Sequence, residues 1–596
     1  MIRKTGWGLG MRILSAVWIA TGFVGLLSAQ HEGKAPETEP LPQASAQRTV
    51  RTTDGHILEG RVLGEGLEDL QILSQDKRIH LLRKDTSGRY RQVTSQLDWP
   101  TYDGALGGNR FTSMTQVAKS NVTRLGPRWI FPMPNVNHLE TTPLVVDGIM
   151  YVTSVNECYA LDAGSGHPIW HYQRSKTRGV VGAVVLGFNR GVAWSGDRLF
   201  MVTDHAHLLA LNRFNGELLW ETEMADWRQN YDANSAPLVV GNLVISGIAG
   251  GDEGVRGFVA AYDIASGKEV WRFWTVPQTG EPGSETWKGN TLEHTGGTTW
   301  MTGVYDARLD FLYWATGNPG SDFYGGDREG DNLYTDSILA LEAKTGKLRW
   351  HYQFTPHDIH DWDAQEPPLL VDADWHGQPR NLLVEANRNG FFYVLDRTDG
   401  QLLLARQFLK KLNWAERIGE DGRPVVKGLP VDANGDNYVC PGFQGATNWF
   451  STSFNPVTGL YYFQALERCN VFSIRKKDWA AGEKYLGGDV HPAPGEGFEK
   501  SLRALNIQTG ETVWEIPQAE ASAPASAGVL STASGLVFFG ENSGSFVAAD
   551  GTSGQILWQF PTNTPLSASP MTYMFDNKQY IAIAAGREII AFALPD

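Results

Sequence analysis

The stretch "YALDAGSGHPIW" (residues 159–170) contains the pattern that decides the fold of this chain. An apolar run leads into a short turn that ends at Gly166, and Trp170 stands four residues after that glycine. The same pattern returns as "LALNRFNGELLW" (209–220) and "AAYDIASGKEVW" (260–271). Two short apolar runs separated by a glycine-containing turn are typical of neighbouring antiparallel strands.

Five further copies of the pattern follow along the chain. Six of the eight copies place Trp four residues after the glycine, whereas Leu404 and Phe463 occupy that position in the other two. Repeats of this kind are typical of sheets arranged radially, because each sheet can bury its faces only against its neighbours. The five further copies are "LALEAKTGKLRW", "YVLDRTDGQLLL", "SFNPVTGLYYF", "RALNIQTGETVW" and "VAADGTSGQILW", and the eight marker glycines are Gly166, Gly216, Gly267, Gly346, Gly400, Gly459, Gly510 and Gly554.

We therefore predict an all-β fold in which an eight-bladed β-propeller spans residues 99–596. The tryptophans are expected to dock each blade on the next one. A small β-rich module is expected before the propeller, over residues 48–95, because polar and apolar residues alternate there around glycine turns. The sequence does not indicate the role of this module.

The first thirty residues, "MIRKTGWGLGMRILSAVWIATGFVGLLSAQ", have the layout of a secretory signal peptide: basic residues, an apolar run and then small residues. We predict that residues 1–30 are removed and that the mature protein is periplasmic. An uncleaved anchor is the alternative, although the apolar run is short for a full membrane span. Residues 31–46 are polar and rich in proline and alanine, which predicts a flexible linker. No later segment is apolar enough to cross a membrane.

Charge and cysteine content narrow the possible classes further. The formal net charge is −15 and no basic stripe is present, so nucleic acid is not an expected partner. Three cysteines are too few for a fold built on disulfides. Cys440 and Cys469 flank strand-like runs and are the favoured pair, which leaves Cys158 free. Without a Cys-x-x-Cys-His motif, haem is not expected to be attached covalently to this chain.

Candidate ligands gather in "TPHDIHDWDAQEPP" (355–368) and in the loops before it. In a propeller, loops from different blades converge on the axis, and the longest interval between marker glycines, Gly267 to Gly346, lies just before this stretch. Carboxylate and amide oxygens suit Ca²⁺ or another hard cation. A helical His–Asp phosphohydrolase is the rival interpretation, but no amphipathic helical pattern surrounds the cluster. The candidates for the hard-cation site are Asp252, Glu253, Asn318, Asp361 and Asp363.

A set of motifs in one order gives the chain a family resemblance. They are "FNRGVAW", "DEGVRGFVAAYD", "GGTTW", "ATGNPG", "TPHDIHDWD", "ANRNGFFYVLDRTDG" and "SASPMTY". With these motifs, residues 99–596 resemble the quinoprotein methanol and ethanol dehydrogenases. The resemblance implies an eight-bladed periplasmic enzyme that binds pyrroloquinoline quinone (PQQ) and a metal ion at the propeller axis. A disulfide of that family also resembles the pair Cys440–Cys469.

The resemblance assigns roles to particular residues. It places the catalytic aspartate at Asp361 and metal ligands at Asn318 and at Asp252, where the family usually has Glu. Trp300 matches the aromatic that stacks on the quinone, and Asn234 stands at a usual Thr. His357, Asp358 and His360 are expected to shape the loop. The residues that resemble quinone contacts are Glu140, Arg190, Asn234, Thr298, Trp300, Arg388 and Asn448.

These residue types fit the implied chemistry. Arg190 and Arg388 can bind the carboxylates of the cofactor through planar forks. A bound cation would polarise the quinone carbonyl, while Asp361 takes the proton of the alcohol. Asp363 resembles the pattern of lanthanide-dependent members, whereas calcium-dependent methanol dehydrogenases carry a small residue there. Because an additional carboxylate helps to neutralise a trivalent ion, a lanthanide is favoured over Ca²⁺, which stays the alternative.

The chain also departs from the family pattern at two places. The adjacent cysteine pair that usually covers the quinone falls on Val184 and Val185, and an aromatic of a late "WGGT" motif falls on Ser526. We predict a PQQ-dependent alcohol dehydrogenase that oxidises a small alcohol and passes electrons to a separate c-type cytochrome. A PQQ dehydrogenase for sugars or aldehydes is one alternative. A non-enzymatic propeller scaffold of the outer-membrane assembly type is the other, and it would not need the implied site residues together.

Overall fold

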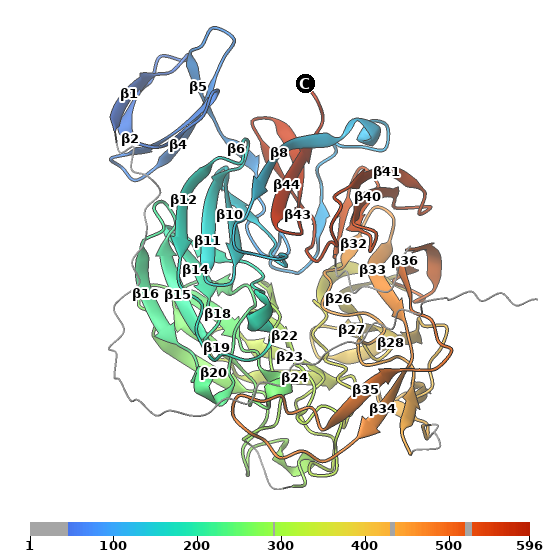
Figure 1. The fold of residues 1–596 in the computed structure, drawn as a ribbon. Coiled ribbons are helices and arrows are strands. Elements are labelled where there is room, and N and C mark those ends of the chain that lie inside the picture. The colour runs from blue at the N-terminus through green and yellow to red at the C-terminus, as the bar shows by residue number, and fades with distance from the viewer. Residues whose placement is uncertain (1–45, 290–292, 430–434, 519–526) are drawn as a thin grey trace, which may run out of the picture. The chain divides into compact units, whose positions relative to one another are not determined.

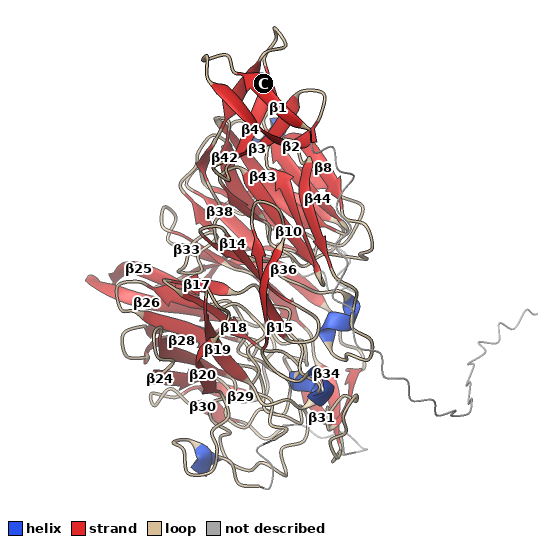
Figure 2. Cartoon of the chain, turned by 90° about the vertical axis from the view of Figure 1, so that its left-hand side faces the viewer, coloured by secondary structure: helices blue, strands red, loops and turns tan. Residues whose placement is uncertain are grey.

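The computed structural model describes residues 46–289, 293–429, 435–518 and 527–596. The predicted signal peptide (1–30) and nearly all of the predicted linker (31–46) therefore lie outside the described residues. Strands and loops dominate, as Figure 2 shows. Among the described residues, no helix has both the length and the apolar character that a membrane crossing requires. The helices are short 3-10 turns, η1 (Val122–Arg124), η2 (Ala183–Leu186), η3 (Trp227–Gln229), η4 (Gly251–Glu253) and η5 (Ser284–Thr286).

In the described part of the chain, eight sheets follow one another around a ring, and we number them as blades 1 to 8 (Figure 1). Blades 1 to 3 use their strands in chain order. The strands are β9 (Leu144–Val146), β10 (Ile149–Ser154), β11 (Glu157–Asp162) and β12 (Pro168–Gln173) in blade 1, β13 (Ala193–Ser195), β14 (Arg198–Val202), β15 (His207–Asn212) and β16 (Leu218–Glu223) in blade 2, and β17 (Leu238–Val240), β18 (Leu243–Gly247), β19 (Phe258–Asp263) and β20 (Glu269–Trp274) in blade 3.

Blades 4 to 6 are built in the same way, except that a separate three-stranded sheet interrupts blade 6. The strands are β21 (Val304–Asp306), β22 (Phe311–Ala315), β23 (Ser337–Glu342) and β24 (Leu348–Gln353) in blade 4, β25 (Leu369–Trp375), β26 (Gln378–Ala386), β27 (Phe391–Asp396) and β28 (Gln401–Gln407) in blade 5, and β32 (Ser453–Asn455), β33 (Leu460–Glu467), β36 (Glu499–Asn506) and β37 (Thr512–Pro517) in blade 6.

Strands from the two ends of the described chain complete blades 7 and 8. In Figure 1 the blue strand β8 lies beside the red strand β44, and the two are antiparallel partners. This pairing closes the ring by hydrogen bonds between segments far apart in sequence. The strands are β38 (Val529–Thr532), β39 (Leu536–Gly540), β40 (Ser545–Asp550), β41 (Ile556–Pro561) and β7 (Phe111–Thr112) in blade 7, and β42 (Met571–Phe575), β43 (Lys578–Ala585), β44 (Glu588–Ala593), β8 (Gly126–Pro132) and β6 (Ser95–Leu97) in blade 8.

The repeated tryptophans dock neighbouring blades, as predicted. Trp170 of blade 1 is buried and donates its Nε1–H to the carbonyl of Arg213 in blade 2, at 2.9 Å. A side-chain carbon added at Gly216, the marker glycine of blade 2, would lie 2.7 Å from the Trp170 ring. Only glycine leaves room for the indole there. Equivalent Trp–glycine contacts join Trp220 to Gly267, Trp271 to Gly346, Trp350 to Gly400 and Trp514 to Gly554.

One of the eight predicted repeats was assigned wrongly. Gly459 lies in the turn between β32 and β33, whereas the other marker glycines lie between the third and fourth strands of a blade. The stretch "SFNPVTGLYYF" therefore belongs to the same blade as Gly510. The missing docking residue is Trp129 in β8, whose indole packs on Gly166 of blade 1 and donates to the carbonyl of Ala163. A local pattern of apolar run, turn and aromatic cannot tell one hairpin of a blade from another.

A five-stranded antiparallel sheet precedes the ring, in agreement with the small β-rich module expected before the propeller. Its buried side chains include Leu70, Ile72 and Leu82. Arg83 of this sheet donates to Asp162 of blade 1 at 2.9 Å, and Arg91 donates to Asp576 of blade 8 at 2.6 Å. Its strands are β1 (Gln47–Arg51), β2 (Ile57–Glu65), β3 (Asp69–Ser74), β4 (Ile79–Lys84) and β5 (Tyr90–Val93).

The predicted disulfide is confirmed. Cys440 and Cys469 are joined with an S–S distance of 2.03 Å, and Cys158 is free and buried. The bridge joins the residue after β31 to the residue before β34, at one end of two paired strands in the extra sheet that interrupts blade 6. The strands outside the blades are β31 (Asn437–Val439), β34 (Asn470–Ile474) and β35 (Gly488–Pro492) in that sheet, and β29 (Ala415–Ile418) with β30 (Pro424–Val426) in a separate hairpin.

Candidate functional site

The predicted site residues come from loops at one end of the blades. Arg190, Asn234 and Asp361 precede the first strand of blades 2, 3 and 5, while Asn318 and Arg388 follow the second strand of blades 4 and 5. In an antiparallel blade, the chain enters the first strand and leaves the second strand at the same end. The marker-glycine turns between the third and fourth strands lie at the opposite end. The docking residues therefore lie at the opposite end of the blades from the candidate site residues.

Ten of the eleven predicted site residues line one cavity of about 240 Å³. Asn448 is the exception, since its side chain donates to the carbonyl of Gln444 at 3.0 Å while the next residue, Trp449, lines the cavity. The ten residues are Glu140, Arg190, Asn234, Asp252, Thr298, Trp300, Asn318, Asp361, Asp363 and Arg388.

Arg388 is the fixed cation between two carboxylates of the cavity. Its Nη1 donates to Asp363 Oδ2 at 2.7 Å, and its Nη2 lies 3.5 Å from Asp361 Oδ2. Burial raises the pKa of Asp361 well above its usual value, and the nearby Asp363 raises it further, whereas Arg388 lowers it. The backbone of Asp361 has a φ of +63°, a conformation that is uncommon outside glycine and that often occurs at functional sites.

The amide of Asn318 is held by two acidic side chains. Its backbone N–H donates to Asp363 Oδ1 at 3.0 Å, and its side-chain Nδ2 donates to Asp322 Oδ1 at 3.1 Å. With the Nδ2 side used in this way, the carbonyl oxygen of the amide is left for another partner. Asp322 is buried and its Oδ2 has no hydrogen-bond partner. Asn318 lines the cavity, so a cation there could bind its amide oxygen.

Asp252 departs from the arrangement expected of a closed metal site. Its carboxylate is about half exposed, with 48% of the side chain accessible, and lies 3.8 Å from Lys484 Nζ. Among the described residues, the carboxylates of Asp252, Asp361 and Asp363 do not form a group whose ligand atoms all lie within 4.8 Å of one another. The structure thus brings the predicted ligands to one cavity without drawing them into contact.

Arg190 organises the opposite side of the cavity. Its Nη2 lies 2.7 Å from Glu140 Oε2, and its Nη1 donates to Asn234 Oδ1 at 2.8 Å. The guanidinium also lies 5.1 Å from the ring centre of Trp300 and 4.5 Å from that of Trp449. Burial raises the pKa of Glu140 to about 7, because the loss of water outweighs the attraction of Arg190. A planar aromatic surface and a carboxylate-binding cation therefore lie side by side.

Asp232 and Trp449 line this cavity but were not among the predicted site residues, and Glu253 was predicted only as a possible cation ligand. Asp232 is buried, both of its carboxylate oxygens lack a partner, and burial together with the neighbouring Glu253 raises its pKa. Burial raises the pKa of Glu253 to about 8, with Asp252 adding to the effect. Asp232 stands two positions before Asn234, and Trp449 belongs to the motif "GATNW", so proximity to predicted residues was the available signal.

The two departures from the family pattern have different outcomes. Val184 and Val185 belong to the short helix η2, where Val184 is buried and Val185 is 58% exposed. Ala183 of the same helix lines the cavity. Because valine stands at both positions, no disulfide can form between them, and alkyl side chains take the place of the cysteine pair. Ser526 lies outside the described residues.

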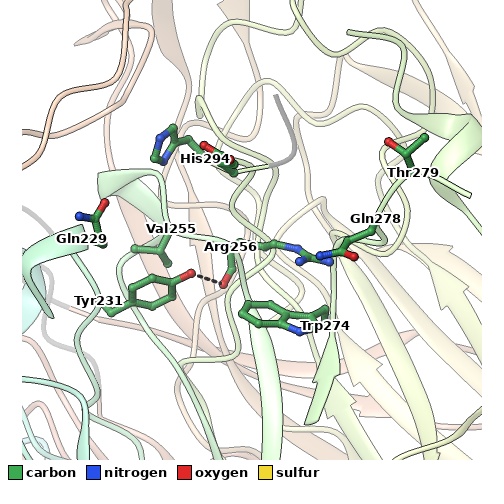
Figure 3. A pocket seen from close by; sticks show the side chains of 9 residues that line it. Gln229, Tyr231, Val255, Arg256, Trp274, Gln278, Thr279 and His294 are labelled. Atoms are coloured by element: carbon green, nitrogen blue, oxygen red, sulfur yellow. Dashed lines mark hydrogen bonds between the residues drawn. The ribbon is translucent and has the colours of Figure 1, made fainter. Parts of the chain in front are cut away.

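A second and larger pocket, of about 570 Å³, contains none of the predicted residues. Figure 3 shows Tyr231 donating to the carbonyl of Arg256, at 3.2 Å, while the Arg256 guanidinium lies over Trp274. That guanidinium also donates to the carbonyl of Val276 at 2.9 Å. This pocket is lined by a single carboxylate, Glu293, whereas the smaller cavity is lined by six, so the smaller cavity offers the better cation site.

The donors of the smaller cavity fit a hard cation and a flat polyanionic cofactor. Carboxylate and amide oxygens line the cavity, and the two carboxylate oxygens of Asp232 have no hydrogen-bond partner there, so a bound cation would compensate their burial. Arg190 and Arg388 are buried, and the Nε of each has no hydrogen-bond partner. Each of these guanidinium groups can therefore donate a further hydrogen bond to an anionic group. Trp300 and Trp449 provide apolar faces for a ring.

Comparisons with known proteins agree with this site. The model of the PQQ family, "Glucose/ethanol/alcohol dehydrogenase, beta-propeller domain", matches residues 99–406 and 515–581. A quinohemoprotein alcohol dehydrogenase, ADH IIB, of Pseudomonas putida is 37% identical over 82% of this chain and 73% of its own length. A lanthanide-dependent methanol dehydrogenase of Methylacidiphilum fumariolicum is 35% identical over 82% of this chain and 84% of its own.

Solved structures give the same result. A europium-containing methanol dehydrogenase superposes with a TM-score of 0.78 at 31% identity, over 84% of this chain and 98% of that chain. These matches define a β-propeller quinoprotein. The chain belongs to the family of PQQ-dependent glucose, ethanol and alcohol dehydrogenases, which confirms the family predicted from its motifs. The enzyme class that follows is a PQQ-dependent alcohol dehydrogenase, an oxidoreductase.

Proposed function

We propose that this enzyme oxidises a small alcohol to its aldehyde in the cavity that contains Asp361 and Arg388. The observation that carries the proposal is the position of Asp361, whose carboxylate is 16% exposed and faces the same space as Trp300, Arg190 and the other carboxylates of the cavity. Bound PQQ would supply the acceptor for the hydride, and a bound cation would polarise its carbonyl. The protein supplies binding, orientation and proton transfer.

Asp361 is the base that we assign to the alcohol. Its carboxylate would accept the hydroxyl proton while the neighbouring Arg388 stabilises the negative charge that Asp361 carries before the transfer. Arg190 and Arg388 would bind the carboxylates of the cofactor, and Trp300 would fix the plane of its ring. Glu140, Asn234 and Thr298 are proposed as polar contacts around it. Asn448 is proposed as a further contact, which would require its side chain to leave the carbonyl of Gln444.

For the metal we propose Asp252, Asn318, Asp361 and Asp363 as ligands, with a lanthanide favoured over Ca²⁺. Asp363 supports this choice, because it adds a second carboxylate next to Asp361 within the cavity. The two relatives described above include a lanthanide-dependent enzyme, which supports the same choice. The exposed position of Asp252 means that metal binding would require its side chain to turn away from Lys484.

Relatives named quinohemoprotein support a cytochrome-type electron acceptor. We propose that the acceptor is a separate c-type cytochrome in the periplasm. The predicted domain boundaries, with a signal peptide over 1–30, a linker over 31–46 and the propeller from residue 99, form part of the same proposal.

Reconstitution tests this function. The full chain is incubated with PQQ and either La³⁺ or Ca²⁺, and dye reduction is followed with small alcohols, aldehydes and sugars. We expect turnover with small alcohols, greater with La³⁺, and loss of turnover in Asp361→Asn. A preference for sugars or aldehydes would favour the second function considered from the sequence. Failure of the protein to bind PQQ with either metal would overturn the proposal.

A further inference from the structure

A second cluster of possible metal ligands lies on blade 2, outside the quinone cavity. His205 stands in the turn between β14 and β15, His207 is the first residue of β15, and Glu221 is in β16. β15 and β16 are antiparallel partners, with Leu209 opposite Glu221. His207 and Leu209 lie on the same face of the sheet because side chains alternate along a strand. The sheet therefore places His207 and Glu221 as diagonal neighbours.

The three side chains converge on one point. One ligand atom from each of His205, His207 and Glu221 lies within 4.8 Å of the others, the one such group of three among the described residues. His207 Nδ1 is 2.6 Å from Glu221 Oε1, and His205 Nε2 is 3.8 Å from the same oxygen. Two ring nitrogens and a carboxylate oxygen are ligands that Zn²⁺ and Cu²⁺ prefer.

The orientation of His205 is independently fixed by Asp204. Asp204 Oδ1 lies 2.9 Å from His205 Nδ1, and the same carboxylate accepts hydrogen bonds of 2.8 Å from the backbone N–H and the hydroxyl of Thr177. A carboxylate on one imidazole nitrogen sets the tautomer so that the other nitrogen is free to bind a metal. Here that other nitrogen, Nε2, faces Glu221. Such a carboxylate–histidine pair is a usual support of metal sites.

The cluster is sheltered but reachable from solvent. The side chain of His205 is 7% exposed, that of His207 19% and that of Glu221 25%. Arg174 Nη1 donates to Glu221 Oε1 at 2.6 Å and would compete with a cation for that oxygen. A metal ion at this point would therefore take the place of Arg174 at Glu221 Oε1. An open fourth position would be filled by water, as in three-ligand zinc sites.

We propose that His205 Nε2, His207 Nδ1 and Glu221 bind one divalent transition-metal ion of the Zn²⁺ or Cu²⁺ type on blade 2. Asp204 is the positioning residue of this site. Its nitrogen ligands distinguish it from the oxygen-lined cavity at Asp361, so the two sites select different classes of metal. The inference does not depend on the enzymatic function. The site would fasten the β14–β15 turn to β16 and so stabilise blade 2.

The test uses Zn²⁺ and Cu²⁺ with the full chain. Isothermal titration with Zn²⁺ is compared between the wild type, His205→Gln with His207→Gln, and His167→Gln as matched control. His167 is suitable because it also pairs with a carboxylate, Asp69 at 2.7 Å, but lacks a second histidine. We expect one Zn²⁺ fewer, or an affinity lowered by at least about tenfold, in the double variant and no change in the control.

A spectroscopic measurement keeps the test decisive if the double variant does not fold. With one equivalent of Cu²⁺ bound to the wild type, electron paramagnetic resonance should show couplings to imidazole nitrogens, which the oxygen donors of the quinone cavity cannot produce. Asp204→Asn should weaken Zn²⁺ binding while leaving its stoichiometry unchanged. Equal Zn²⁺ binding in wild type and double variant, or a Cu²⁺ spectrum without nitrogen couplings, would overturn the inference.

Discussion

Arg388 and Asp363 form a buried charge-assisted hydrogen bond, with Nη1 of the arginine 2.7 Å from Oδ2 of the aspartate. The other terminal nitrogen of Arg388 lies 3.5 Å from Asp361. Arg388, which follows β26, thus contacts two carboxylates that both come from the loop between blades 4 and 5. This leaves net negative charge in the cavity, which explains why the same space suits a metal ion.

Asp361→Asn should lower kcat by about a hundred- to ten-thousand-fold, because the amide cannot accept the alcohol proton. The substitution keeps the size of the side chain, so the cofactor should still bind. Steady-state kinetics with a small alcohol and a quinone absorbance titration measure the two effects separately. Retention of more than a tenth of the wild-type kcat would contradict the assignment of Asp361 as the base.

Asp363→Ala should weaken La³⁺ binding more than Ca²⁺ binding, by at least about tenfold in relative affinity. The reason is that a lost carboxylate removes more attraction from a trivalent ion than from a divalent one. Luminescence of Tb³⁺ and its displacement by Ca²⁺ provide the measurement without catalysis. Asp374→Ala, an aspartate at the end of β25, is the control. Equal losses for both ions would argue against a charge-selective role of Asp363.

Glu140 should make the cofactor-free protein less stable as pH rises. Burial raises its pKa from an ordinary 4.5 to about 7, so the folded state holds a proton that the unfolded state releases. The stability linked to this proton is present below about pH 4.5 and is lost as pH rises through about 7. Glu140→Gln cannot titrate and should lack this part of the profile. Thermal unfolding of both proteins from pH 4 to pH 8 tests the difference, which should widen in favour of the variant.

Trp170→Ala should destabilise the propeller by about 3–5 kcal/mol, since it removes a buried indole from the contact between blades 1 and 2. Trp170→Phe keeps most of the apolar contact and loses the hydrogen bond to Arg213, so its cost should be about 1 kcal/mol. Denaturant titrations with unchanged slopes give both values. Equal costs for the two substitutions would show that packing on Gly216 is unimportant.

Reduction of the Cys440–Cys469 bridge should lower stability by about 2–5 kcal/mol, because the bridge closes a loop between residues 29 apart in sequence. The double variant Cys440→Ser, Cys469→Ser should reproduce the loss, and Cys158→Ser, at the free cysteine, is the control for thiol replacement. Unfolding with and without reductant measures it. A wild-type protein that is insensitive to reductant would contradict a structural role for the bridge.

The residues that share the cavity could be named from the sequence because its loops carry the motifs by which the chain resembles its family. Asp361, Asn318 and Arg388 stand in polar stretches directly before or after apolar runs, and each such stretch falls at the same end of its blade. The direction of a side chain was not predictable in the same way. Asp252 turns to Lys484, and Asn448 turns to Gln444, because partners distant in sequence compete for these groups.

Other residues became candidates only through burial. Asp232 and Asp322 look like ordinary loop aspartates in the sequence, yet both are buried with unpartnered carboxylate oxygens. The cluster of His205, His207 and Glu221 depends on the pairing of two strands and on a turn. Burial and the convergence of side chains result from tertiary packing, so the spacing of residues in the sequence cannot predict them.

The amino-acid sequence by itself determined the class of the fold and the family of the enzyme. Strand alternation, glycine turns and docking tryptophans are local patterns, and they repeat often enough to specify a propeller. The tertiary structure decided which hairpin belongs to which blade, how β8 closes the ring against β44, and which carboxylates share the cavity. These features depend on contacts between segments that are remote in the chain, so they exist only once the blades have packed.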